Sequence, residues 1–284
     1  MTGGRVVIRT PRLTIEGKSR AGNETWFRVR ELGIALDIGR CPDLLVGTPN
    51  VFITHAHLDH ALGVPYYAAQ RRLHRLGAGR VFVPAESAAD YRELMALHER
   101  MEDTLYPVDI VGLAPGETRP LRRDLLVRAH SATHRVVANG WEFCEVRHKL
   151  KAEHASRTPD ELRRLREDGV AVDVLVERPI LFYTGDTDRR ILEGNEALYR
   201  AEVLMIECSF TAPGEEERGR KYAHIHLSDI WDHAERFENE LIVLTHFSLR
   251  DSAKEIHRRV ADEAPAALRG RLALSLPEPH TRVT

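Results

Sequence analysis

The chain contains 284 residues, of which 43% are hydrophobic and 30% are charged, and its formal net charge is −2. This length accommodates one large domain or two small ones with a substantial core, and the near-neutral charge excludes a strong overall attraction to nucleic acid. No apolar stretch reaches the roughly 18 residues of a membrane-spanning helix, and residues 1–10 lack the apolar core of a signal peptide. Three distant cysteines, Cys41, Cys144 and Cys208, favour a reducing cytoplasm over a disulfide framework.

Short apolar runs alternate with amphipathic stretches, a pattern that predicts strands and helices in turn. In chain order we expect strands at 33–38 and 51–54, a helix at 62–76, a strand at 80–84, a helix at 86–101, strands at 125–129 and 140–146, a helix at 159–168, strands at 180–184 and 203–206, a helix at 228–237, a strand at 241–245, a helix at 253–263 and a strand at 272–276. Two of the helices follow capping boxes, Thr158 with Glu161 and Ser252 with Glu255. No low-complexity linker divides the chain, so the pattern predicts a layered α/β fold in one domain over residues 1–284.

Residues 147–178 form a basic insertion within this pattern, and basic residues outnumber acidic ones between positions 147 and 166. A solvated helical face is one interpretation of this composition. A local patch that binds phosphate groups is the other, because a near-neutral chain can still concentrate cations in one place.

Three imidazoles and one carboxylate are packed into six residues directly after the apolar run at 51–54. They are His55, His57, Asp59 and His60. Neutral imidazole and carboxylate are ligands that divalent cations of hard and borderline character prefer. Four ligands in so tight a loop cannot all serve one tetrahedral ion that keeps an open catalytic position, so we expect two ions to share the loop.

Further candidate ligands follow three other predicted strands, as active-site groups do in open α/β sheets. They are His134, Asp186 and His246, with His130 as a rival to His134 on the same segment. One ion is assigned to His55, His57 and His134, and the other to Asp59, His60 and His246. Asp186 is expected to bridge the ions, because its carboxylate has two oxygens.

Such a pair of cations determines the chemistry that the sequence predicts. Two divalent ions about 3.5–4 Å apart acidify a bound water and clamp an in-line displacement at phosphorus. A hydroxide that bridges the ions would be a nucleophile near neutral pH, and Asp59 would orient it. The motif therefore indicates a metal-dependent hydrolase.

Residues 55–60, 133–134, 184–187 and 244–246 resemble the metallo-β-lactamase superfamily. Within that superfamily, the chain resembles the ribonuclease Z family over nearly its whole length, and above all the short form of plants and some bacteria. The segments most specific for this likeness are residues 34–42, 148–151, 224–239 and 244–248. The resemblance implies a four-layer αββα sandwich with a dinuclear site at the strand ends that holds two zinc ions per chain, manganese or iron being the alternatives.

The resemblance also implies a carboxylate and an imidazole that donate a proton to the departing ribose oxygen. These roles fall on Glu207 and on His226, with His224 as the rival of His226. A carboxylate that hydrogen-bonds an imidazole raises its basicity and fixes its tautomer, as a proton donor requires. Asp59, His226 and Glu207 are therefore the expected catalytic residues.

Two features depart from the ribonuclease Z pattern. Many family members carry a long Gly/Pro-rich arm that grips the tRNA elbow, whereas residues 142–178 here are rich in Arg and Lys without that character. The Pro-x-Lys-x-Arg-Asn loop of many members is also missing from residues 17–25. The candidate RNA-binding residues of the basic insertion are Lys149, Lys151, Arg157, Arg163, Arg164 and Arg166.

The resemblance implies a cytoplasmic endoribonuclease that removes 3′ trailers from precursor tRNA as a homodimer, in which one subunit holds the tRNA body and the other cuts. Its affinity would come from phosphate contacts and fall with salt; no membrane or DNA partner is expected. One alternative is a dizinc hydrolase of small phosphodiesters, cyclic nucleotides or other esters, because fold and metals do not fix the substrate. Another is a non-enzymatic scaffold, against which the complete ligand set argues.

Overall fold

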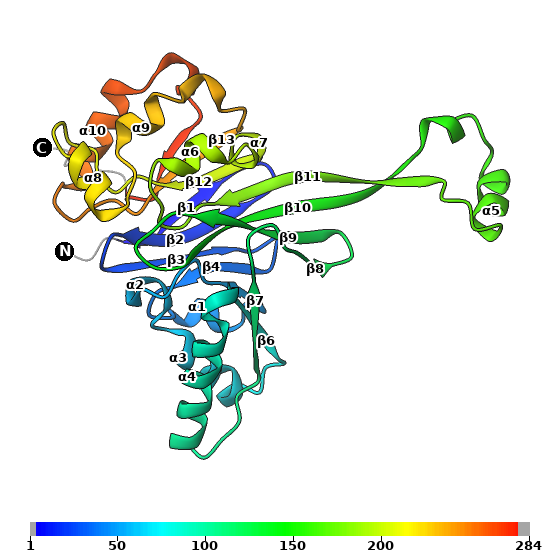
Figure 1. Cartoon of the computed structure of the whole chain (residues 1–284), viewed down its shortest axis with the longest axis horizontal. Coiled ribbons are helices and arrows are strands. Elements are labelled where there is room, and N and C mark those ends of the chain that lie inside the picture. The colour runs from blue at the N-terminus through cyan, green and yellow to red at the C-terminus, as the bar shows by residue number, and fades with distance from the viewer. Residues whose placement is uncertain (1–3, 278–284) are drawn as a thin grey trace, which may run out of the picture.

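The computed structural model describes residues 4–277, in which two β-sheets pack face to face between two outer layers of helices (Figure 1). One apolar layer lies between the sheets, where Phe52 stacks on Phe82 and meets Trp141 and Phe143 edge-on. One further apolar layer lies between each sheet and the helices that cover it. The four-layer αββα sandwich predicted from the sequence is confirmed.

The first sheet has seven strands in chain order, antiparallel from β1 to β4 and parallel from β4 to β7. Its strands are β1 (Val6–Arg9), β2 (Thr14–Arg20), β3 (Glu24–Val29), β4 (Ile34–Ile38), β5 (Asn50–Phe52), β6 (Gly79–Pro84) and β7 (Val108–Leu113). The helices of this half are α1 (Asp43–Val46), α2 (Leu58–Ala61), α3 (Val64–Leu73), the 3-10 turn η1 (Ala85–Ser87) and α4 (Ala88–Met101). They cover the outer face of the sheet through buried side chains such as Val64, Tyr67 and Met95.

The second sheet repeats this plan, antiparallel from β8 to β11 and parallel from β11 to β14. Its strands are β8 (Thr118–Arg122), β9 (Leu125–Ala132), β10 (Ala138–Leu150), β11 (Asp173–Tyr183), β12 (Val203–Glu207), β13 (Leu241–Thr245) and β14 (Leu272–Leu274). The helices of its outer face are α6 (Arg190–Gly194), α7 (Ala197–Arg200), α8 (Glu216–Tyr222), α9 (Leu227–Trp231), α10 (Ala253–Glu263) and the 3-10 turns η3 (Ala234–Arg236) and η4 (Ala266–Leu268). The parallel strands are buried on both faces, which explains why they read as continuous apolar runs in the sequence.

Strands β10 and β11 continue beyond the sandwich as a two-stranded ribbon, which we call the arm (residues 147–178; Figure 1). The arm ends in the 3-10 turn η2 (Ala152–His154) and helix α5 (Pro159–Glu167). Both halves of the predicted capping box at Thr158 are present, and they fix the start of α5. The basic insertion is therefore a projecting structure with most of its side chains in solvent.

The predicted strands and helices are all found, with two differences. The helix expected at 62–76 begins earlier, as α2, and the helix expected at 228–237 divides into α9 and η3. Strands β1 to β3, β7 and β8 and helices α1, α6, α7 and α8 were not predicted from the sequence. In β1 to β3, charged side chains hide the alternation of apolar residues. In β2, for example, Glu16 is buried and is neutralised by Arg28 at 2.6 Å and Arg5 at 2.9 Å.

No helix within residues 4–277 is both long and apolar enough to cross a lipid bilayer.

Candidate metal centre

The histidine-rich loop (residues 53–57) connects the carboxyl end of β5 to α2. His55 follows the strand and is fully buried, and His57 is the residue that precedes the first turn of α2. Because α2 begins at Leu58, Asp59 and His60 lie on that first turn and not in an extended loop. The tight turn directs the four side chains into one space.

The other candidate ligands reach the same space from the second sheet. His134 follows β9, Asp186 follows β11 and His246 follows β13. Two groups of donor atoms contain the seven predicted ligands, and a third, overlapping group joins Asp186 and His246 to His224; within each group all donors lie within 4.8 Å of one another. The first group is His55, His57, His134 and Asp186, and the second is Asp59, His60 and His246. All seven residues named from the sequence are thus brought together, whereas His130 bonds Glu142 at 2.8 Å outside both groups.

In four of the histidines, the Nδ1 atom points away from the site and forms a hydrogen bond there. If Nδ1 carries the proton, the Nε2 atom that faces the site has a free lone pair. The acceptors of their Nδ1–H groups are Thr54 Oγ1 for His55 (3.0 Å), Asp37 for His60 (2.8 Å), the Ala223 carbonyl for His134 (3.0 Å) and Ser209 Oγ for His246 (3.0 Å). Such bonds fix the tautomer and the orientation of metal-binding histidines. The chain therefore presents ligands that are already aligned.

The inner nitrogens of each group converge to hydrogen-bond distance of one another, although the Nε2 atoms of His55, His60, His134 and His246 carry lone pairs when their protons are on Nδ1. His57 Nδ1 lies 3.0 Å from His55 Nε2 and 3.3 Å from His134 Nε2. In the second group, His60 Nε2 lies 3.2 Å from His246 Nε2. Lone pairs that face one another at these distances repel unless a cation lies between them, so the donor set fits a bound metal in each group.

Asp186 lies between the two groups. One of its oxygens is 3.7 Å from His55 Nε2 and 3.3 Å from His246 Nε2, and the other is 3.4 Å from His60 Nε2. The second oxygen, Oδ1, is buried and has no hydrogen-bond partner within the described residues. A buried carboxylate oxygen needs a compensating charge, and a cation in each group would supply it to both oxygens.

Electrostatics favour the metal-binding form of most of these ligands; the exception is His60, where burial is outweighed by the Asp186 and Asp37 carboxylates, which raise the pKa of its imidazole until a cation replaces the proton. Burial lowers the pKa of His55, His57 and His134, so their imidazoles are neutral. Burial opposes ionisation of Asp186, but the surrounding imidazoles of His246 and His60 hold its pKa well below the usual range. Metal binding at such a site does not require the loss of protons from its carboxylate.

Asp37 supports the loop from beneath and was not anticipated from the sequence. Its fully buried carboxylate accepts hydrogen bonds from the Thr54 N–H (2.8 Å), the His60 ring (2.8 Å) and the Tyr183 hydroxyl (2.7 Å). Because Tyr183 belongs to β11 and Thr54 follows β5, Asp37 connects the two sheets under the site. Its backbone is in the left-handed region, with φ 51°, a conformation that persists only where the surroundings enforce it.

Glu207 at the end of β12 pairs with His224, not with His226. His224 Nδ1 lies 2.7 Å from Glu207 Oε1, and its ring centre is 5.1 Å from that of His134 and 5.3 Å from that of His246. His226 instead caps α9, where its ring bonds Ser228 and the Ala212 carbonyl. His224 therefore occupies the place that the sequence analysis expected for His226.

Burial disfavours the charged form of His224, but the Glu207 carboxylate outweighs this effect and raises the pKa of His224 to about 9. The imidazole is thus protonated at neutral pH and lies beside both ligand groups. Ser209 extends this pair, because its hydroxyl donates to Glu207 Oε2 at 2.7 Å while it accepts from His246. The sequence signal for Ser209 was its position two residues after Glu207, on the same strand end.

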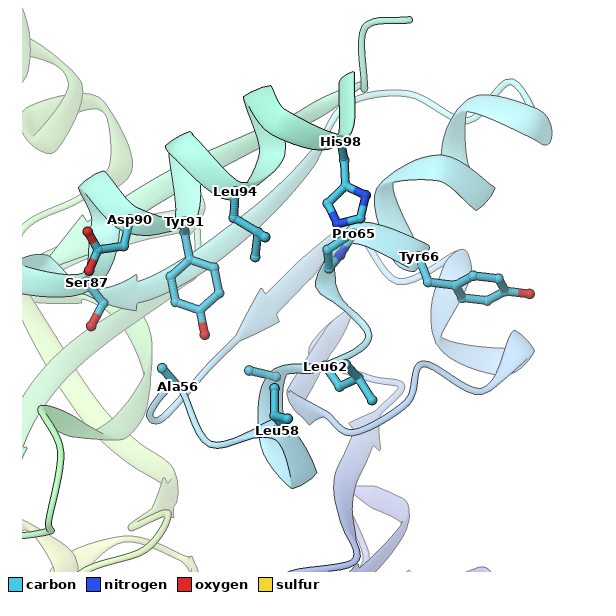
Figure 2. A pocket seen from close by; sticks show the side chains of 11 residues that line it. Ala56, Leu58, Leu62, Pro65, Tyr66, Ser87, Asp90, Tyr91, Leu94 and His98 are labelled. Carbon is cyan, nitrogen blue, oxygen red and sulfur yellow. The ribbon is translucent and has the colours of Figure 1, made fainter. Parts of the chain in front are cut away.

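An apolar cavity of about 590 Å³ lies next to the histidine-rich loop (Figure 2). Tyr91 and Leu94 of α4 point toward Leu58, the first residue of α2, and Leu62, which directly follows α2. Leu58 is 69% exposed and Leu62 is 51% exposed, which is unusual for large apolar side chains that lie next to one another.

The candidate RNA-binding residues all lie on the arm, and ion pairs divide them into two sets. Arg163 pairs with Glu167 at 3.0 Å, Arg166 with Asp173 at 2.9 Å and Lys151 with Glu153 at 3.9 Å. Within residues 4–277, Lys149, Arg157 and Arg164 pair with no carboxylate. These three exposed cations are the ones left to meet an anionic partner.

Comparison with known proteins defines the class to which this fold and site belong. The family model described as "Beta-lactamase superfamily domain" matches residues 42–247. The metallo-beta-lactamase fold protein YhfI of Bacillus subtilis superimposes with a TM-score of 0.62 at 13% identity, covering 91% of this chain and 94% of that one. The short form of human tRNase Z gives 0.56 at 16% identity over 87% and 86% of the two chains. The chain has the metallo-β-lactamase fold, and its His/Asp cluster makes it a metal-dependent hydrolase of that class.

Proteins related in sequence place the chain in one family within this class. The tRNase Z TRZ1 of Arabidopsis thaliana is 36% identical over 261 residues, which cover 91% of this chain and 93% of that protein. The chloroplastic tRNase Z TRZ2 of the same plant is 34% identical over 87% of this chain and 70% of that protein. A ribonuclease Z of Pseudomonas putida is 30% identical over 79% and 76%. The chain belongs to the ribonuclease Z family.

Removal of the Ser209 hydroxyl tests how the second ligand group is held. We expect Ser209→Ala to weaken binding of one of two cations about tenfold, because His246 loses the acceptor that orients its ring. Ser209→Thr keeps the hydroxyl and should retain most of the affinity. Competition with a chelator measures both variants; wild-type affinity for both cations in Ser209→Ala would contradict the assigned role.

Proposed function

We propose that this chain is an endoribonuclease that removes 3′ trailers from precursor tRNA. The observation that carries the proposal is the position of His224, which is hydrogen-bonded to Glu207 beside both ligand groups. The departing group in RNA cleavage is a ribose 3′ oxygen, which leaves poorly unless it is protonated, whereas a small aryl diester has a good leaving group. A built-in proton donor therefore favours RNA, in agreement with relatives named tRNase Z.

Different residues have different roles in the proposed reaction. Two bound divalent cations would acidify a water and neutralise charge on the phosphate. Asp59 is placed to orient the attacking water, because its Oδ2 is fixed by the Gly22 N–H at 2.9 Å and lies 3.5 Å from His60 and 3.6 Å from His246. His224 gives its proton to the ribose oxygen as the P–O bond breaks, leaving a 3′ hydroxyl on the tRNA.

Zinc is the cation that we propose, with one ion for each ligand group and two per chain. The seven donors are five imidazoles and two carboxylates, a set that suits zinc and also accommodates manganese or iron. Zinc is supported by the preponderance of nitrogen donors, because manganese prefers oxygen.

A homodimer is the proposed assembly. It is supported by the apolar surface around Leu58, Leu62, Tyr66 and Leu94, which is exposed on the described chain and would be covered by a second copy (Figure 2). In such an assembly, one subunit can hold the tRNA body while the other cuts.

The cytoplasm is the proposed location. All three cysteines are free and buried in the structure, and burial raises the pKa of Cys41 and Cys144 to about 12. Thiols of this kind are inert small side chains in the core, as is usual for proteins of a reducing compartment.

Incubation of the zinc-loaded protein with a 3′-extended precursor tRNA tests the proposed function. We expect one cut at the end of the tRNA body and a 3′ hydroxyl on the product. Asp59→Ala should abolish the cut without lowering the melting temperature by more than a few degrees, because Asp59 lies at the surface of the site. Hydrolysis of bis(p-nitrophenyl) phosphate with no cut in the precursor would instead indicate a small-substrate hydrolase.

The pH dependence of cleavage tests the proton donor. Glu207 raises the pKa of His224, so the donating form persists below about pH 9 and is lost as the pH rises through that value; bound cations shift this limit downward. We expect Glu207→Gln to move the alkaline limb of kcat/KM for precursor tRNA to lower pH. An unchanged limb in this variant would exclude the pair as the proton source.

Replacement of the unpaired arm cations tests RNA binding. We expect the triple variant Lys149→Ala, Arg157→Ala, Arg164→Ala to bind precursor tRNA more weakly and to reduce the slope of log affinity against log salt by about two to three. Turnover of bis(p-nitrophenyl) phosphate should not change. The matched control is Arg163→Ala with Arg166→Ala, two arm cations that already have carboxylate partners. An equal loss in both variants would contradict this division.

A further inference from the structure

A polar cavity of about 370 Å³ adjoins His224 on the side of the second sheet's helices. Its walls include Asp188 and Arg189 before α6, Arg220 in the last turn of α8, and Asp229 in α9. A cavity of this size can hold a ribose with its phosphate, and none of its principal walls is apolar. It is therefore suited to a small, polar, charged group.

The cations of this cavity differ in how far they are already neutralised. Arg190 donates to Asp188 in a hydrogen bond of 2.8 Å, so this pair is closed. Arg189 lies 3.9 Å from Glu193, the limit of an ion pair. Arg220 is exposed and forms no ion pair with a carboxylate of the described residues. A guanidinium without a carboxylate, at the rim of a polar cavity, is an available phosphate ligand.

The position of His224 indicates which nucleotide of the RNA would bind in this cavity. Its Nδ1 is held by Glu207, so only Nε2 can deliver a proton to the departing oxygen. The ribose that carries this oxygen must lie within hydrogen-bond reach of Nε2. That ribose belongs to the last nucleotide retained on the tRNA, because cleavage leaves a 3′ hydroxyl there. The attacking water lies on the opposite side of the phosphorus, and the phosphate remains on the 5′ end of the trailer.

We propose that this cavity is the subsite for the last retained nucleotide and that Arg220 binds the phosphate on its 5′ side. The inference rests on the proposed function, since it requires that the ribose of the cleaved linkage lies against His224, which lines the cavity. It assigns Arg220 a part in positioning the substrate and none in the chemical step. A small diester has no phosphate at that position and cannot use the subsite.

The test combines a protein variant with a change in one linkage of the RNA. The zinc-loaded full chain is assayed as wild type and as Arg220→Ala on precursor tRNA, on bis(p-nitrophenyl) phosphate, and on a precursor with an uncharged methylphosphonate 5′ of the last retained nucleotide. Binding of mature tRNA without a trailer gives a second readout that needs no cleavage. The matched control is Arg218→Ala, on the same helix and directed to Glu215 instead of the cavity.

We expect Arg220→Ala to raise KM for the precursor and weaken mature tRNA binding about tenfold each, the effect of losing one charge-assisted hydrogen bond. The kcat and the turnover of the small diester should stay within about twofold. The methylphosphonate should weaken the wild type by a similar factor and Arg220→Ala no further, since residues that act on one contact are not additive.

The assignment of Arg220 would be overturned if Arg220→Ala and the methylphosphonate weakened binding additively. It would also be overturned if Arg218→Ala and Arg220→Ala had equal effects. In both cases, cleavage of the precursor by the wild type would still support the proposed function. A wild-type protein that hydrolyses the small diester but leaves every precursor uncut would overturn both.

Discussion

The close approach of two strand ends, one from each sheet, is the constraint on which the metal centre depends. Gly185 lies between Thr184 and Asp186 with φ 59°, and a Cβ atom on it would come within 2.5 Å of Thr54. Only glycine tolerates both this conformation and this contact. The approach brings Asp186 from β11 against the histidine-rich loop after β5, so one carboxylate can serve both ligand groups.

Hydrogen bonds beneath the site convert this approach into a fixed arrangement of ligands. Asp37 holds Thr54 and His60 of the first sheet together with Tyr183 of the second. On the other side, Ser209 joins His246 to Glu207. His224, Ser209 and His246 are therefore connected through Glu207, and His246 lies next to His60, so the proposed proton donor and the proposed ligands belong to one network.

The sequence was sufficient to predict that the seven candidate ligands lie together, because they occur after apolar strands, and the ends of such strands lie close together in a layered sheet. It was insufficient for the partner of Glu207. His224 and His226 are two residues apart, and the choice depends on the left-handed turn at Ala223, φ 57°, and on the capping of α9 by His226. Neither feature has a periodic signal. Asp37 was missed for a similar reason, since its contacts come from Thr54, His60 and Tyr183, which are distant in sequence.

The division of the ligands between the two sheets has a consequence for the newly synthesised protein. The first sheet contributes His55 to His60, while His134, Asp186 and His246 come from the second sheet, and His246 is near the end of the chain. A nascent polypeptide that has emerged only as far as β11 carries the first ligands without their last partner. The second group of donors is therefore complete only after β13 has joined its sheet.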